Sequence, residues 1–226
     1  MIQDDDQHYE LSLLKTGDLV FFSGKGPLSV LVQIGTRSQW SHIGMIVHVN
    51  DEPCIWESRY RSRYHSIKYQ LGRTTLPPSK PGVSTTPLRI RLRHFDGKIS
   101  VRPLKHPLTE HQLISLSQFR EEVKDRPYEK HGMELLKAIY DGPGGQNAED
   151  LSSFFCSELV AETYQRLGLL VDDKDGGKPS NEYTPKDFTP PGRLELQLNN
   201  ALGPQILLRP RRRRQPMLTR KLSEET

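Results

Sequence analysis

The fold expected for this chain depends on one stretch, Phe154-Phe155-Cys156-Ser157-Glu158-Leu159-Val160, which continues to Gly168. Apolar residues recur there at the three- and four-residue spacing of one helix face, at positions 155, 159, 160, 164 and 167. Ser152 or Ser153 can cap the start of such a helix, and Gly168 can end it in a left-handed conformation. The sequence therefore predicts a buried helix with a cysteine near its beginning.

Cys156 has two alternative roles at this position. In the first turn of a helix, unpaired backbone amides and the positive end of the helix dipole favour a thiolate, which is the nucleophilic form of cysteine. Without such a role, a buried cysteine is a small core residue. The second cysteine, Cys54, lies in a predicted strand where nothing obvious lowers the pKa of its thiol. We expect Cys54 to stay protonated near neutral pH and Cys156 to be substantially ionised.

A second informative stretch runs from His42 to Val49 and predicts a strand. Its odd-numbered positions are all apolar and share one face, so that His42 and Gly44 lie on the other face. A two-residue turn at Asn50-Asp51 would place Glu57 opposite Gly44 and diagonal to His42, where a carboxylate can hold the imidazole. A four-residue loop would instead slide Glu57 too far along the strand. Both registers stay open, so Glu57 is either the partner of His42 or an ordinary surface glutamate.

Three blocks of sequence, in order, carry a resemblance to a known family. They are Gly17-Asp18-Leu19-Val20-Phe21-Phe22, Trp40-Ser41-His42-Ile43-Gly44-Met45-Ile46-Val47 and Phe155-Cys156-Ser157-Glu158-Leu159-Val160. This order resembles that of the permuted papain-like hydrolases, the YiiX/YebB-like branch of the NlpC-type amidase superfamily, in which the histidine strand precedes the cysteine helix. The resemblance spans most of residues 17 to 168. It implies an α+β, circularly permuted papain-like fold, with an antiparallel sheet packed against the cysteine-bearing helix.

The same resemblance implies a cysteine hydrolase that cleaves an amide, ester or thioester bond through a covalent thioester. Cys156 would attack the carbonyl, His42 would take the thiol proton and later protonate the leaving group, and Glu57 would orient His42. Backbone amides at the helix start would hold the oxyanion. No metal or other cofactor is expected, and His42 and Cys156 are expected to meet in the fold. A lipid acyltransferase with the same chemistry, and an inactive module that binds an anionic ligand, stay as alternatives.

Composition gives one domain over residues 1–208 and a basic tail over residues 209–226. The tail carries seven Lys or Arg and two Glu, and the rest of the chain has a net charge of −1 although the whole has +4. Such a tail is expected to be disordered and solvated, or to touch anionic lipid or nucleic acid; the domain itself needs no nucleic acid. Two cysteines, no long apolar run and no signal-peptide pattern favour the cytoplasm.

Residues 58–95 hold nine basic side chains and no acidic one. They are either a basic lid over the cleft, which would favour an anionic substrate, or a solvated insertion. Within them, residues 74–87 predict a loop, and the alternation of residues 88–93 predicts a half-buried strand with a basic outer face. The remaining predicted elements are strands at 17–22, 98–104 and 205–208, helices at 27–34, 113–123 and 129–140, and a turn at 184–188.

Overall fold

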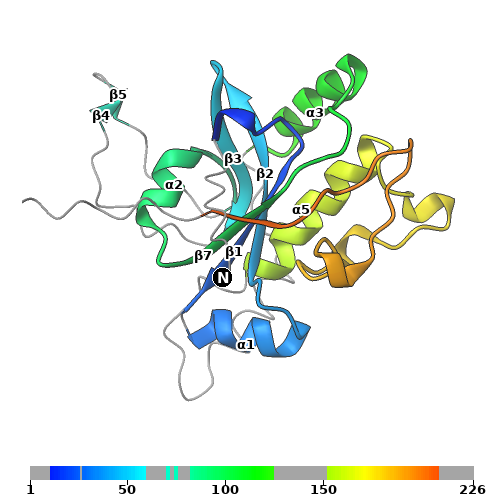
Figure 1. Ribbon diagram of the computed structural model, residues 1–226. Coiled ribbons are helices and arrows are strands. Elements are labelled where there is room, and N and C mark those ends of the chain that lie inside the picture. The colour runs from blue at the N-terminus through cyan, green and yellow to red at the C-terminus, as the bar shows by residue number, and fades with distance from the viewer. Residues whose placement is uncertain are drawn as a thin grey trace, which may run out of the picture.

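The computed structural model describes residues 11–25, 27–59, 70–71, 74–75, 82–124 and 152–208. Its main sheet has six strands in the order β6-β3-β2-β1-β7-β8, and each neighbouring pair is antiparallel. Helices α3 and α5 lie on one side of this sheet and α2 lies on the other (Figure 1). The expected α+β class is confirmed. The described part of the chain holds the elements β1 (Leu19–Gly24), α1 (Pro27–Thr36), β2 (His42–Val49), β3 (Glu52–Arg59), β4 (Gln70–Leu71), β5 (Thr74–Thr75), β6 (Gly82–Pro87), α2 (Leu88–His94), β7 (Gly97–Arg102), α3 (Glu110–Glu122), α5 (Ser152–Arg166) and β8 (Ile206–Leu208).

The hairpin of β2 and β3 turns over two residues. Val49 pairs with Glu52, and the intervening Asn50 and Asp51 both have positive φ angles, 49° and 60°. Two successive left-handed residues make the tight turn that matches the twist of antiparallel strands, and Asn and Asp tolerate this conformation. The sequence had left two registers open, and the structure has the shorter turn.

Helix α5 is fixed at its far end and along its buried face. Gly168 adopts a φ of +67°, and the N–H of Leu169 returns to the carbonyl of Tyr164, so the helix ends as predicted in a glycine-dependent cap. The hydroxyl of Tyr164 donates to the Gly17 carbonyl at 2.8 Å, just before β1 begins. Through this contact the cysteine-bearing helix is tied to the central strands.

The two faces of the sheet bury separate apolar clusters. On one face, Ile43 and Met45 of β2 pack with Leu159 and Val160 of α5. On the other face, a cluster that includes Ile46 and Ile55 packs with Leu88 of α2 and with Val20, Phe22, Ile99 and Val101. The odd-numbered positions of β2 therefore share one face, as their alternation predicted, and this face meets α5, while the other face meets α2.

Two predictions for the segment after residue 74 are wrong. Residues 82–87, which were predicted as loop, form β6 and pair with β3. Residues 88–93, which were predicted as a strand, form most of α2. Over six residues, alternation also fits a short helix in which Leu88 and Arg91 lie one turn apart on the buried side. Since β6 already fills the edge beside β3, the chain turns at Pro87 and lies back over the sheet.

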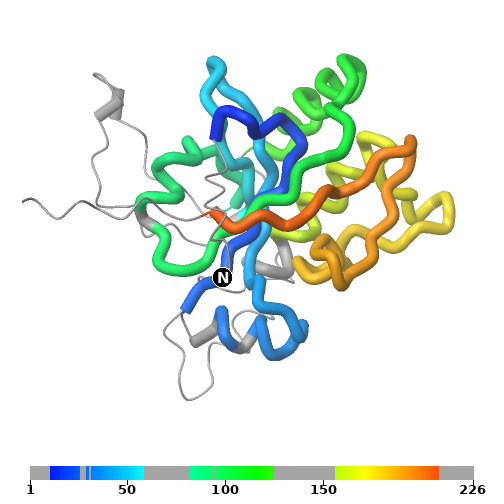
Figure 2. The backbone as a smooth tube through the Cα atoms, in the orientation of Figure 1, coloured from blue at the N-terminus to red at the C-terminus, as the bar shows by residue number. Residues whose placement is uncertain are grey.

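Other predicted elements are confirmed, and some lie outside the described residues. The predicted helices at 27–34 and 113–123 correspond to α1 and α3, and α3 begins with a reciprocal capping interaction between Thr109 and Gln112. In Figure 2 the orange segment returns to the sheet, where β8 pairs with β7. The predicted helix at 129–140, the tail 209–226 and parts of the basic segment (60–69, 72–73 and 76–81) lie outside the described residues. Within the described part, no helix combines the length and apolar character needed to cross a bilayer.

Candidate active site

His42 and Glu57 form a buried hydrogen-bonded pair. The imidazole Nε2 lies 2.6 Å from Oε2 of Glu57, and the two residues are 7% and 0% exposed. The register of β2 and β3, which pairs Met45 with Trp56, places Glu57 opposite Gly44 when it is continued by one residue. A Cβ added at Gly44 would lie 3.1 Å from Cβ of Glu57 and 2.8 Å from the Ile55 side chain. The glycine thus leaves the space in which the glutamate reaches His42.

Glu57 also bonds Arg91 of α2, a contact that the sequence did not predict. Its Nε lies 3.2 Å from Oε1 of Glu57, so the two carboxylate oxygens bond different partners. The guanidinium also lies over the ring of Phe22, 4.4 Å from its centroid. That ring is 5.6 Å from the imidazole of His42, centroid to centroid. The Phe22 ring therefore lies against both Arg91 and His42, the two residues that Glu57 bonds.

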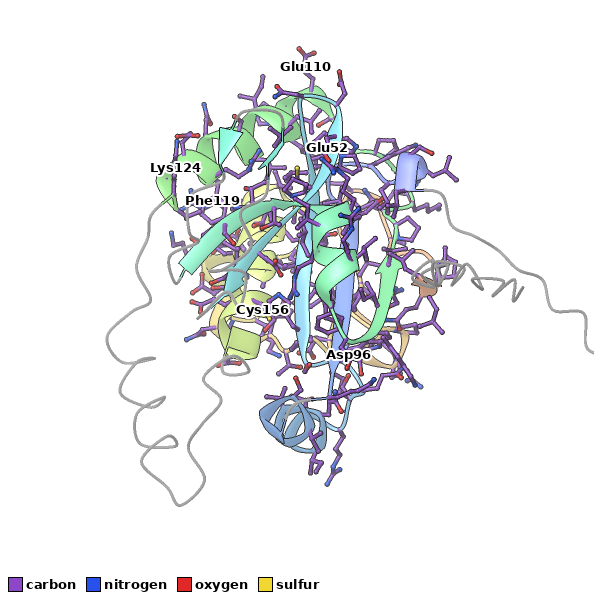
Figure 3. All side chains as sticks on the ribbon, turned by 90° about the vertical axis from the view of Figure 1, so that its left-hand side faces the viewer. Glu52, Asp96, Glu110, Phe119, Lys124 and Cys156 are labelled. Atoms are coloured by element: carbon purple, nitrogen blue, oxygen red, sulfur yellow. The ribbon has the colours of Figure 1, made fainter. Side chains whose placement is uncertain are left out.

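Cys156 reaches the strand that carries the histidine. Its Sγ accepts the backbone N–H of Ile43, the residue next to His42, at 3.4 Å. The N–H of Ile46 bonds the backbone carbonyl of Asp18, on the side of β2 that faces β1. Successive N–H groups of a strand point to opposite sides, so those of Met45 and Ile43 point toward β3. The paired part of β2 and β3 ends at Met45 and Trp56. The N–H of Ile43 therefore bonds Sγ of Cys156 instead of a backbone carbonyl of β3. Figure 3 shows Cys156 where the start of α5 meets the strands.

The cysteine and the histidine come from opposite sides of the sheet. His42 and Glu57 lie on the face that α2 covers, as their contacts with Phe22 and Arg91 show. Helix α5 packs on the other face of β2 and β3. At the end of the paired region, where the two strands stop exchanging hydrogen bonds, Sγ lies beside the β2 backbone and bonds the N–H of the residue next to His42.

Burial favours the protonated thiol of Cys156, whereas the sequence predicted a thiolate. Removal from water and, to a smaller extent, the nearby Glu57 carboxylate raise the pKa of the Cys156 thiol to about 12. The N–H groups of Ile43, Ser157 and Cys156 itself lower the pKa but do not outweigh burial. The prediction of a thiolate near neutral pH is therefore wrong for this arrangement. Burial also raises the pKa of Cys54, which agrees with the expectation that it stays a thiol.

Asp18 and Ser157 of the sequence blocks, and Asp187 of the predicted turn, hold neighbouring segments in place. The carboxyl of Asp18 accepts the N–H groups of Lys15 and Leu104 and so joins the start of β1 to the end of β7. Burial raises the pKa of Asp18. Ser157 donates to the Tyr183 carbonyl at 2.6 Å, which holds the loop after α5 against the helix. The turn at 184–188 is closed by Asp187, whose carboxylate accepts from the backbone and hydroxyl of Thr184.

Sequence reasoning named Cys156, His42 and Glu57 as candidate site residues and did not name Arg91. The pair of His42 and Glu57 is in contact, and Cys156 bonds the residue beside His42. The signal for Arg91 was present in the helical spacing of Leu88, Arg91, Leu92 and Phe95, which the shorter alternating pattern concealed. In the part of the chain that the structure describes, no cluster of three or more His, Cys, Asp or Glu side chains could hold a metal ion.

Comparison with known proteins finds similarity to YiiX of Escherichia coli. No protein-family model matches the chain. The sequence is 24% identical over 196 residues to YiiX of Escherichia coli K12, described as an uncharacterized protein, and the match covers 86% of this chain and 76% of YiiX. A crystal structure of YiiX from Escherichia coli O157:H7, described as a metalloprotein, aligns with a TM-score of 0.44 at 24% identity, covering 68% of this chain and 66% of that chain. The chain is thus similar in sequence to YiiX over most of its own length.

Proposed function

We propose that this protein is a cysteine hydrolase with a permuted papain-like fold, in which Cys156 is the nucleophile, His42 the general base and Glu57 the residue that orients His42. The observation that carries the proposal is the buried His42–Glu57 hydrogen bond, one residue from the backbone N–H that bonds Cys156 Sγ. The substrate class is an amide, ester or thioester of a peptide-like or acyl compound. Two buried thiols fit the reduced, cytoplasmic compartment that the composition favours.

The proposed reaction begins with a neutral thiol. With Nε2 bonded to Glu57, the thiol proton of Cys156 passes to Nδ1 of His42 as Sγ bonds the carbonyl carbon. The carbonyl π electrons move to oxygen and give a tetrahedral oxyanion. When this collapses, the bond to the leaving amine, alcohol or thiol breaks, and the leaving group takes the proton from His42. The thioester is then cleaved by water, whose proton goes to His42 and from there back to Sγ.

The pKa of about 12 determines how the nucleophile would be activated. A thiol this basic is not ionised at rest, so proton removal has to accompany attack on the carbonyl. The N–H of Ile43 already points at the sulfur and would stabilise negative charge that develops there. If an alcohol or amine replaces water in the second half of the reaction, the same residues perform acyl transfer.

The second candidate function is that of a binding module that holds a ligand without catalysing a reaction. The raised pKa and complete burial of Cys156 favour it, because a protonated buried cysteine is usually an inert core residue. The basic segment could then provide the contacts for an anionic ligand. In this case the His42–Glu57 pair would serve only the packing of the sheet and α2.

A panel of amide, ester and thioester probes tests the proposal. The purified 226-residue chain should release product from at least one probe class, and Cys156→Ala should abolish this release. Cys54→Ala is the matched control, since it removes the other buried thiol and should keep turnover. Mass spectrometry of the intact protein should detect an acyl group on Cys156, and an added alcohol acceptor distinguishes acyl transfer from hydrolysis. Equal product release by wild-type protein and Cys156→Ala would contradict the proposal.

A further inference from the structure

We infer that Arg91 is a positioning residue, whose guanidinium holds Glu57 as the carboxylate that fixes His42 and thereby sets the pH at which the His42–Glu57 pair gains a proton. The inference rests on the proposed roles of His42 and Glu57. It assigns a task to a buried arginine of α2 that makes no direct contribution to the proposed bond-forming steps.

The two oxygens of Glu57 divide their bonds between a cation and the imidazole. Oε1 accepts from Nε of Arg91 at 3.2 Å, and Oε2 bonds Nε2 of His42 at 2.6 Å. The side chains of Glu57 and Arg91 are 0% and 10% exposed, so water screens this interaction little. A carboxylate held from both sides keeps its plane fixed, and the imidazole that bonds it keeps a fixed orientation.

Aromatic rings hold the guanidinium in place. Its Cζ lies 4.4 Å from the ring centroid of Phe22 and 5.2 Å from that of Phe95. These rings meet edge to face with their centroids 5.0 Å apart. Arginine stacks on aromatic faces in this way because its charge is delocalised over a flat group. Since Phe22 also contacts the His42 ring, displacement of the guanidinium would disturb the imidazole from two directions.

The fold places Arg91 beside Glu57, while the nearby Arg89 lies at the other end of β3. Strand β6 pairs with β3, and α2 follows directly and packs back on β3. Arg91 lies one helical turn after the buried Leu88, on the side that faces the sheet. Arg89, two residues earlier, is exposed and pairs with Glu52 at the other end of β3. Among the described residues, the Arg91–Glu57 pair at the candidate site is buried, whereas the Arg89–Glu52 pair is partly exposed.

The charges around the imidazole decide its protonation. Among the described residues, Glu57 from β3 bonds the His42 ring, Arg91 from α2 bonds Glu57, and Cys156 from α5 bonds the backbone N–H next to His42, while β1 contributes the apolar Phe22. With Arg91 present, the negative charge of Glu57 is balanced, and a neutral imidazole leaves no net charge in the cluster. Without Arg91, a buried carboxylate stands unbalanced, and the pair would retain a proton to higher pH.

The test is an NMR titration of the His42 ring nitrogens between pH 5 and 9, with His42→Ala used to assign the resonance. Arg91→Met should raise the titration midpoint of the His42 ring by about one unit or more, whereas Arg91→Lys, which keeps the charge, should restore most of it. Arg102→Met is the matched control. Arg102 is also buried, at 9% exposure, but it bonds the backbone carbonyls of Phe188, Leu202 and Gly203 rather than a carboxylate. This control can cost stability and should leave the midpoint unchanged.

Two results would overturn the inference. One is a midpoint in Arg91→Met that stays within about 0.3 unit of the wild-type value, and the other is an equal shift in Arg102→Met. If Arg91→Met does not fold, Arg91→Gln removes the charge while it keeps a donor for Glu57, and the same criteria apply. The readout involves no turnover. A shifted midpoint in a protein that cleaves no probe would therefore support the role of Arg91 and contradict only the proposed hydrolase.

Discussion

Replacement of Glu57 by glutamine should destabilise the protein far more than the same replacement at Glu52. Both glutamates lie on β3 and both pair with an arginine of α2. The Glu57 side chain is 0% exposed and that of Arg91 10%, whereas the values are 32% for Glu52 and 41% for Arg89. Glutamine has nearly the shape of glutamate, so the comparison isolates the loss of charge from the creation of a cavity.

The expected magnitudes follow from burial. Glu57→Gln leaves the Arg91 cation buried without its counter-charge, and loss of one member of a buried ion pair costs about 3–5 kcal/mol. Glu52→Gln removes a pair that water screens, which contributes about 0–1 kcal/mol. The double variant Glu57→Gln/Arg91→Met should regain part of the loss, because it leaves no buried unpaired charge.

Urea denaturation of the full chain measures these differences. With a slope of about 2 kcal/mol per molar urea, Glu57→Gln should lower the midpoint by about 2 M, while Glu52→Gln should lower it by less than about 0.5 M. A loss at Glu57 no larger than the loss at Glu52 would refute the reasoning. It would mean that the His42–Glu57–Arg91 cluster does not hold the charges that its geometry indicates.

Two further predictions concern Gly44 and the ionisation of Cys156. Gly44→Ala should lower the free energy of unfolding, measured by urea denaturation, by about 1–3 kcal/mol, because the added Cβ would lie 2.8 Å from the Ile55 side chain. At Gly35 nothing lies within 4 Å of an added Cβ, so Gly35→Ala should not destabilise the protein. Equal effects of the two substitutions would contradict the packing at Gly44. The folded state raises the thiol pKa of Cys156 from 9.0 to about 12, so its stabilising contribution is complete below pH 9 and is lost as pH rises toward 12. Wild-type protein should therefore lose about 1.4 kcal/mol more than Cys156→Ala between neutral pH and pH 10, and parallel pH profiles would show that Cys156 is not buried as a thiol.

The hairpin shows how far local sequence rules reach. Alternation along β2 gave the correct faces for His42 and Ile43, and turn chemistry at Asn50-Asp51 offered the correct register as one of two. The choice between the registers depends on packing that pairs distant segments, such as the fit of Glu57 beside Gly44 and below α2. A single sequence does not specify that packing.

Arg91 and Cys156 show where sequence rules fail. Six alternating residues fit both a strand and a short helix, and the tertiary position of β6 decided for the helix that buries Arg91. For Cys156, the helix start predicted a lower pKa for the thiol, but complete burial has the larger effect and raises it. Burial of a single atom depends on the neighbours that the whole fold supplies.

The central claim is that His42 removes the proton of the Cys156 thiol, and the most direct measurement is the rate at which Cys156 reacts with a chloroacetamide probe at pH 7. The comparison is between the Cys54→Ala protein and the Cys54→Ala/His42→Ala protein, so that only Cys156 is labelled in each. Intact-protein mass spectrometry follows the reaction. General-base catalysis contributes about 10²- to 10⁴-fold, and we predict that His42→Ala slows labelling by at least about 10²-fold while the protein stays folded. Labelling rates within about two-fold of each other would contradict the claim and leave a binding module as the function.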